Sequence, residues 1–115
     1  MMKTFIRVMK ALSDPNRVKI IKMLQSRPLC VCEITKALKI AQSTASKHLK
    51  ILEDAELVNS FKDGLWVNYS ISDHHPSPYS ASMIANLGHW LETESEIQEL
   101  IQSLSHINRH DITGK

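Results

Sequence analysis

The sequence predicts a mainly α-helical domain that carries one β-hairpin, an α+β arrangement. Most of the chain has apolar residues at the spacing of an amphipathic helix, whereas LVNSFKDGLWVNYSIS, residues 57–72, alternates apolar and polar residues. Asp63-Gly64 lies in the middle of this alternating stretch. Because both residues tolerate the positive φ values of a type I′ turn, the pair predicts a hairpin here.

Length and composition fit one small globular domain. The chain has 115 residues, of which 43% are hydrophobic, and a net charge of +2. We expect one domain over residues 1–110 and a flexible tail over 111–115, since single cores usually close at about 100–150 residues. No apolar run approaches the ~18 residues of a membrane span, and MMKTFIRVMK lacks the apolar core of a signal peptide. We therefore expect a cytoplasmic protein with no membrane partner.

The first part of the chain predicts two helices. Asp14 is a good N-cap and Pro15 suits the first helical position, so a helix runs from there to about Gln25, before Pro28. Another helix is expected over residues 2–12, where an apolar stripe has helical spacing: Phe5, Val8, Met9 and Leu12.

Two further helices, separated by a tight turn, follow over residues 30–38 and 42–55. The second has an apolar face of Ala45, Leu49 and Leu52. Its opposite face is small, polar and basic, and carries Ser43, Ser46, Lys47 and Lys50. A short helix, a three-residue turn and a second helix predict a helix-turn-helix over residues 30–55.

The last third predicts a linker, SDHHPSPYS, and then a long helix over residues 79–107. Gly88 or the stretch ETES is expected to kink or split this helix. Its apolar positions follow the helical period: Met83, Ile84, Leu87, Leu91, Ile97, Leu100, Ile101 and Leu104.

A hairpin directly after a helix-turn-helix is typical of a wing, here residues 57–72 with a tip at Lys62-Asp63-Gly64. The polar, basic face of the second helix suits the major groove of DNA, where lysine contacts phosphate or guanine and glutamine reads adenine. A plain surface helix beside a surface hairpin is the alternative, as in a scaffold or dimerisation protein. No Ser-His-Asp spacing, phosphate loop or carboxylate pair indicates an enzyme or an organic cofactor.

Four segments together resemble the ArsR/SmtB family of bacterial winged-helix repressors: DPNRVKIIKML, LCVCEITKAL, QSTASKHLKILEDAELV and KDGLWVNYSIS. The resemblance covers nearly the whole chain, and LCVCEI is typical of the arsenic- and cadmium-sensing branches. It implies a homodimer built from the first and last helices. It also implies operator binding without inducer, and release when a metal or metalloid binds.

Position by position, the resemblance places the DNA-binding residues on the second helix of the helix-turn-helix and on the wing. On the helix these are Gln42, Ser43, Thr44, Ser46, Lys47, His48 and Lys50, and on the wing Lys62. His48 has a second interpretation, as packing against the first helix. A two-fold dimer would read an inverted repeat in double-stranded DNA, with half-sites about 34 Å apart.

Cys30 and Cys32 are the only cysteines, and soft thiolates suit As(III), Sb(III), Cd(II), Hg(II), Cu(I) or Zn(II). Cysteines in the cytoplasm stay reduced, so such a pair is more often metal-binding or redox-active than structural. Residues i and i+2 of a regular helix lie about 200° apart. We therefore expect chelation of As(III) or Sb(III) to deform the start of the helix at Cys30.

The third cysteine of the arsenic-sensing motif is replaced by Thr35, so the remaining ligand must come from elsewhere. Three alternatives stay open. The pair could form a redox-sensitive disulfide, or fill the core as small apolar side chains. A zinc site could lie on the last helix, at His106 and His110 or on the face of His89, Glu92 and Glu96; the linker pair His74 and His75 is a weak metal signal.

Overall fold

Local capping signals fix the starts of two helices in the computed structural model, which describes residues 1–74 and 77–108. Asp14 accepts hydrogen bonds from the backbone N–H groups of Asn16 (2.8 Å) and Arg17 (3.2 Å), and Pro15 takes the first helical position, as predicted. Ser77 and Pro78 repeat this arrangement later in the chain.

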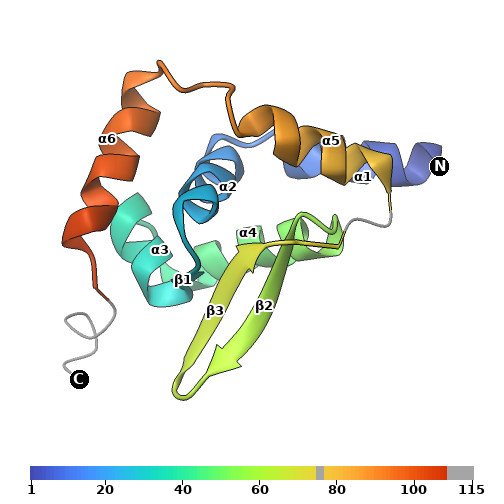
Figure 1. The fold of residues 1–115 in the computed structure, drawn as a ribbon. Coiled ribbons are helices and arrows are strands. Elements are labelled where there is room, and N and C mark those ends of the chain that lie inside the picture. The colour runs from blue at the N-terminus through green and yellow to red at the C-terminus, as the bar shows by residue number, and fades with distance from the viewer. Residues whose placement is uncertain (75–76, 109–115) are drawn as a thin grey trace.

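The elements follow one another in the predicted order, with one additional short strand (Figure 1). Helices in the first half are α1 (Met2–Ala11), α2 (Pro15–Ser26), α3 (Val31–Leu38) and α4 (Gln42–Asp54). The strands are β1 (Leu29–Cys30), β2 (Val58–Asp63) and β3 (Trp66–Ile71). The chain continues through α5 (Pro78–Leu87), α6 (Ser95–Ser103) and the 3₁₀ turn η1 (Leu104–His106).

The core confirms the helical apolar faces that the sequence predicts. Ala45, Leu49 and Leu52 of α4 are fully buried, and they meet Ile34 of α3 and Ile21 of α2 in one apolar cluster. Burial of this face leaves the opposite face of α4 at the surface. The amphipathic period therefore decides which side chains of α4 are available to a partner.

The hairpin forms where predicted, but its turn differs from the expected type. Asp63 pairs with Trp66, so the two-residue loop is Gly64-Leu65 and not Asp63-Gly64. Gly64 has a φ of +62°, while Leu65 is not among the residues with positive φ. The predicted type I′ turn is wrong, because it requires positive φ at both central residues; positive φ at the first alone fits type II′.

Strand β1 corrects the predicted start of the third helix. Leu29 and Cys30 pair antiparallel with Tyr69 and Asn68 of β3, which gives a three-stranded sheet of order β1-β3-β2. Cys30 is extended (φ −82°, ψ 163°) and is the N-cap of α3 rather than its first helical residue. Pairing with a strand far along the chain supplies backbone hydrogen bonds that local pattern does not reveal.

The helix predicted over residues 79–107 is split into α5 and α6, as expected, with Gly88 as the C-cap of α5 and Glu94 as the N-cap of α6. Lys22 of α2 binds at this break. Its ammonium group is buried and donates to the carbonyl oxygens of Leu87 (2.6 Å) and Trp90 (2.9 Å). It also pairs with the Glu92 carboxylate at 2.8 Å. A cation at the C-terminus of α5 satisfies carbonyl groups that would otherwise continue the helix, so the chain turns there.

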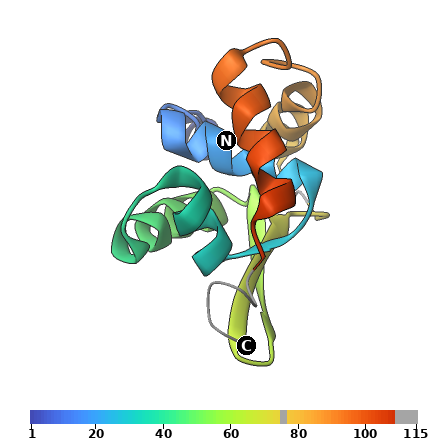
Figure 2. The ribbon, with the colours of Figure 1, turned by 90° about the vertical axis from the view of Figure 1, so that its left-hand side faces the viewer.

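The two halves of this split segment lie against different parts of the molecule. Helix α5 runs alongside α1, where the rings of Phe5 and Tyr79 meet edge to face with centroids 5.3 Å apart (Figure 1). Helix α6 packs on α2 and α3. The β2–β3 hairpin projects away from the helices in both views (Figures 1 and 2). Within residues 1–74 and 77–108, no helix has the length and apolar character of a membrane span.

Candidate nucleic-acid interface and thiol site

The outward face of α4 carries most of the side chains expected to bind DNA. Gln42, Ser43, Thr44, Ser46, Lys47 and Lys50 are exposed, and His48 is half-buried. The turn before α4 is made by Lys39, whose φ of 58° reverses the chain after α3. Helix α4 itself begins at Gln42, and its N-cap residue, Ala41, makes no side-chain cap. The polar face therefore belongs to the second helix of a helix-turn-helix.

Lys62 lies apart from this helix, on the exposed hairpin. It is in β2, opposite Val67 of β3, and next to the Asp63–Trp66 pair that closes the strands. Leu65 at the turn is 75% exposed. The structure thus places the predicted helical residues together and Lys62 on a second, protruding element.

Charges on and beside the outward face of α4 are partly balanced within the chain. Lys50 pairs with Asp54 at 3.2 Å, and Glu53 accepts a hydrogen bond from the Ser60 hydroxyl at 2.9 Å. Burial of Tyr69 raises its pKa, and the nearby Glu53 carboxylate raises that pKa further. The Tyr69 hydroxyl therefore stays protonated and adds no negative charge near α4.

Arg17 of α2 is a residue of this region that the sequence interpretation missed. Its Nη1 contacts Nδ1 of His48 at 3.2 Å, so it joins α2 to α4. Its Nε and Nη2 donate to the carbonyl oxygens of Ala11 (2.7 Å) and Lys10 (3.2 Å) at the end of α1. The expected packing of His48 toward the first helix is thus mediated by an arginine.

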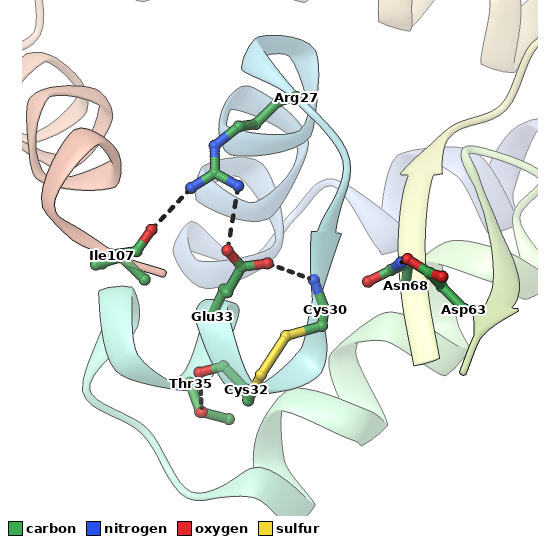
Figure 3. The surroundings of a disulfide bond; sticks show 8 residues. All are labelled: Arg27, Cys30, Cys32, Glu33, Thr35, Asp63, Asn68 and Ile107. Carbon is green, nitrogen blue, oxygen red and sulfur yellow. Dashed lines mark hydrogen bonds and ion pairs between the residues drawn. A yellow bond between two sulfur atoms is a disulfide. The ribbon is translucent and has the colours of Figure 1, made fainter. Parts of the chain in front are cut away.

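Cys30 and Cys32 are joined by a disulfide at the start of α3 (Figure 3). Their Cα atoms are 5.4 Å apart. Cys30 is 1% exposed and extended, whereas Cys32 lies in the first turn of α3 and is half-buried. The premise that both cysteines lie in a regular helix is wrong, because only Cys32 is helical. The expected deformation on chelation stays a prediction.

A buried carboxylate connects this pair to η1 (Leu104–His106) and to the residue that follows it. Glu33, 4% exposed, accepts from the Cys30 backbone N–H at 2.9 Å and pairs with Arg27 at 3.1 Å (Figure 3). Arg27 also donates to the carbonyl oxygens of Leu104 and Ile107, each at 3.1 Å. The spacing of Cys30 and Glu33 resembles a capping box, which is the one sequence signal for this network.

Two sulfurs are the only soft ligands here. The Thr35 hydroxyl donates to the Cys32 carbonyl at 2.8 Å, so it is engaged with the backbone. Across the described ranges, no cluster of three or more His, Cys, Asp or Glu side chains could hold a metal. His89 is exposed beside Trp90 and His106 lies in η1, while His75 and His110 fall outside the described residues.

Comparison with known proteins gives a consistent assignment. Residues 14–60 match the family described as "Bacterial regulatory protein, arsR family". The arsenical resistance operon repressor of Escherichia coli is 32% identical over 104 residues, which cover 90% of this chain and 86% of that protein. A CadC homolog of Staphylococcus aureus, a cadmium resistance regulatory protein, is 40% identical over 60% of this chain and 58% of its own length.

Solved structures agree on the fold. A homodimeric winged helix-turn-helix DNA-binding domain from Mycobacterium bovis superposes with a TM-score of 0.64 at 26% identity, covering 76% of this chain and 77% of that one. The fold class predicted from the sequence, a mainly helical winged helix-turn-helix, is therefore confirmed.

Proposed function

The chain belongs to the arsR family of bacterial regulatory proteins, and from that premise we propose that it is a repressor released from its operator when a thiophilic ion binds Cys30 and Cys32. Family membership makes the chain a DNA-binding transcriptional regulator and not an enzyme, as the sequence predicted. Its DNA contacts, inducer and cytoplasmic location remain predictions.

The exposed polar face of α4 supports a role in major-groove reading. Gln42, Ser43, Thr44, Ser46, Lys47, His48 and Lys50 would contact DNA from α4, and Lys62 would contact the flanking backbone from the hairpin. Lysines contribute phosphate contacts, while glutamine and hydroxyl side chains can bond base edges. Two copies related by a two-fold axis would place two such faces on one inverted repeat.

A homodimer is supported by apolar side chains that the described fold leaves exposed. Phe5 and Ile6 of α1 are 39% and 42% exposed, and Trp90 and Leu91 after α5 are 45% and 41% exposed. These residues lie in α1 and just after α5, and the resemblance to the family implies a dimer built from the first and last helices. Light scattering on the purified protein should give twice the chain mass; a monomer at micromolar concentration would contradict the dimer.

The observation that carries the inducer proposal is the convergence of the Cys30 and Cys32 sulfurs at the N-terminus of α3. After reduction of the disulfide, thiolates on two residues whose Cα atoms lie 5.4 Å apart could both bind one soft ion, with only Cys32 inside the helix. As(III) or Sb(III) is the first choice, since the similar E. coli protein is named for arsenical resistance. Cd(II) or Zn(II) is the alternative, given the cadmium regulator of S. aureus.

These residues fit part of a thiophilic site. Cys30 and Cys32 would supply two ligands, and the third would be hydroxide or an external thiol, because the described chain offers no third cysteine. Ion binding would tie the end of β1 to the first turn of α3. Since Ile34 of α3 shares a core cluster with Leu49 of α4, a shift of α3 would displace the reading face.

Fluorescence anisotropy of labelled operator DNA tests the proposal. Reduced protein bound to DNA is titrated in parallel with As(III), Sb(III), Cd(II) and Zn(II). We expect As(III) or Sb(III) to release the DNA at the lowest concentration, and the Cys30→Ser plus Cys32→Ser variant to bind DNA without responding. Release of the serine variant at the same As(III) concentration would contradict the assignment of the site.

A redox switch is the second candidate function, because the structure contains the Cys30–Cys32 disulfide. A peroxide would oxidise one thiolate to a sulfenic acid, and attack by the other thiol would form the disulfide and release water. The half-buried Cys32 is the accessible sulfur and Cys30 the buried partner. Mild peroxide should then remove two hydrogens by mass spectrometry and change operator affinity; oxidation without such a change would exclude the switch.

A further inference from the structure

Arg17 makes three simultaneous contacts that link three helices. The guanidinium group donates through Nε and Nη2 to the Ala11 and Lys10 carbonyl oxygens, and its Nη1 lies 3.2 Å from Nδ1 of His48. The first two bonds fix the guanidinium plane at the end of α1. Because the fork is rigid, its third arm has little freedom in where it meets the imidazole ring.

The contact with Arg17 determines which ring nitrogen of His48 carries the proton. Arginine has only donors, so Nδ1 of His48 must be the acceptor in this bond. In a neutral imidazole whose Nδ1 accepts, the proton is on Nε2. Arg17 therefore selects the Nε2–H tautomer of a histidine that lies on the reading helix.

The Nε2 atom is available to an external partner. Among the described residues, the His48 ring makes one hydrogen bond, at Nδ1, and none at Nε2. In the same part of the chain no buried side-chain nitrogen or oxygen lacks a partner, so an unbonded Nε2 must be accessible to solvent. His48 also lies next to Lys47, which is exposed on the same helix.

We propose that Arg17 is a positioning residue that holds His48 as the Nε2–H tautomer and so presents a fixed neutral hydrogen-bond donor to DNA from α4. This rests on the proposed function of α4 as the reading helix. A donor fixed before binding loses less conformational freedom on contact than a free side chain does. The acceptor is a phosphate oxygen or a base-edge acceptor of DNA, and the experiment separates these two sources.

The same geometry gives Arg17 a second consequence for α4. Helix α1, which we expect in the dimer interface, ends at the two carbonyl groups that Arg17 binds. Arg17 thus fixes the position of the His48 imidazole relative to the end of α1, the helix that we expect in the dimer interface. A role as a structural clamp alone would predict loss of stability without any change in the tautomer.

Two measurements on the reduced full-length protein test the proposal. Long-range ¹H–¹⁵N correlation spectra of the histidine rings report the tautomer, and operator anisotropy at several salt concentrations reports affinity and its salt slope. The variants are Arg17→Met, which keeps the aliphatic stem, and His48→Phe, which keeps a ring without donors. His48→Gln restores a neutral N–H donor, and Lys47→Met is the matched control for a phosphate-binding cation.

We expect wild-type His48 to show the Nε2–H pattern and Arg17→Met to show a mixture of tautomers. His48→Phe should weaken operator binding by about three- to tenfold, the range for one hydrogen bond. Arg17→Met should weaken it less, by about twofold if half of the rings carry the other tautomer. Their salt slope should stay unchanged, whereas that of Lys47→Met should fall by about 1. His48→Gln should recover part of the affinity.

The acceptor is identified by repeating the titration with non-operator DNA. An equal loss on both DNAs for His48→Phe indicates a phosphate acceptor, and a loss on the operator alone indicates a base edge. An Nδ1–H pattern in the wild type would overturn the proposal, as would weaker binding by Arg17→Met with the tautomer unchanged. If Arg17→Met does not fold, the wild-type spectrum and His48→Phe decide. Absence of wild-type operator binding would instead contradict the proposed function, independently of the tautomer.

Discussion

The two helices of the helix-turn-helix begin in opposite ways. The start of α3 is closed by internal bonds: Glu33 is buried, accepts from the Cys30 N–H and pairs with Arg27. The start of α4 has no side-chain cap at Ala41, and its first residues, Gln42 to Thr44, are exposed. One helix start is held by the protein, and the other is left for a partner.

This difference separates stability from binding. The bonds at the start of α3 are shielded from water. Because an unpaired polar group is costly in a buried site, substitutions there should mainly lower the stability of the fold. Side chains on the outward face of α4 cover little of the core, so changes there should be felt in DNA affinity. Arg27 extends the network that begins at the Cys30 N–H to the carbonyl oxygens of Leu104, in η1, and of Ile107.

Glu33→Ala should break the bonds that close the start of α3, and it should have the largest effect on stability. It leaves the buried Cys30 N–H without its acceptor and Arg27 without its carboxylate, which should lower the free energy of unfolding by about 2–3 kcal/mol. Urea unfolding measures this. Glu99→Ala, an exposed glutamate of α6, is the control, and its effect should stay within about 0.5 kcal/mol. Equal midpoints for the two variants would show that the Glu33 network does not stabilise the fold.

Lys47→Ala should change only DNA binding by the exposed face of α4. Removal of one phosphate contact should reduce the slope of log affinity against log salt by about 1, uniformly across DNA sequences. Its unfolding midpoint should remain that of the wild type, because the side chain is exposed. An unchanged salt slope, measured by anisotropy, would remove Lys47 from the DNA contacts.

Thr35→Cys should sharpen the comparison with only a small change in stability. The lost hydroxyl bond to the Cys32 carbonyl should cost about 0.5–1 kcal/mol. A third thiol one turn after Cys32 should lower the As(III) concentration needed for half-release of operator DNA. If the reduced variant responds at the wild-type concentration, position 35 does not contribute to ion binding.

Much of the fold could be predicted from local sequence. Asp14 and Pro15 predict the start of α2, and the alternation of residues 57–72 predicts the hairpin. The helical spacing of Ala45, Leu49 and Leu52 predicts the buried face of α4. These features depend on residues close together in the chain, which is why pattern and spacing reveal them.

The features missed depend on contacts between distant residues. Lys22 binds the Leu87 carbonyl at the end of α5 across a separation of 65 residues, and Arg17 contacts His48 across 31. Of these features, only the break at Gly88 was expected from the sequence. Cys30 is extended because it pairs with Asn68 of β3, although its own neighbours suggest a helix. The extended backbone of Cys30 changed the interpretation of the candidate site, since it lets the two sulfurs converge without distorting α3. The positions of Cys30 and Cys32 as a pair were nevertheless evident from the sequence.

Reciprocal linkage tests the central claim, that ion binding at Cys30 and Cys32 weakens DNA binding by α4, and the reverse. The affinity of reduced protein for As(III) is measured by calorimetry with and without saturating operator DNA, and compared with the effect of As(III) on operator affinity. Thermodynamics requires the two factors to be equal, and typical couplings correspond to about 5- to 150-fold. We predict weaker As(III) binding on DNA by the same factor; equal As(III) affinity in both states would contradict the account.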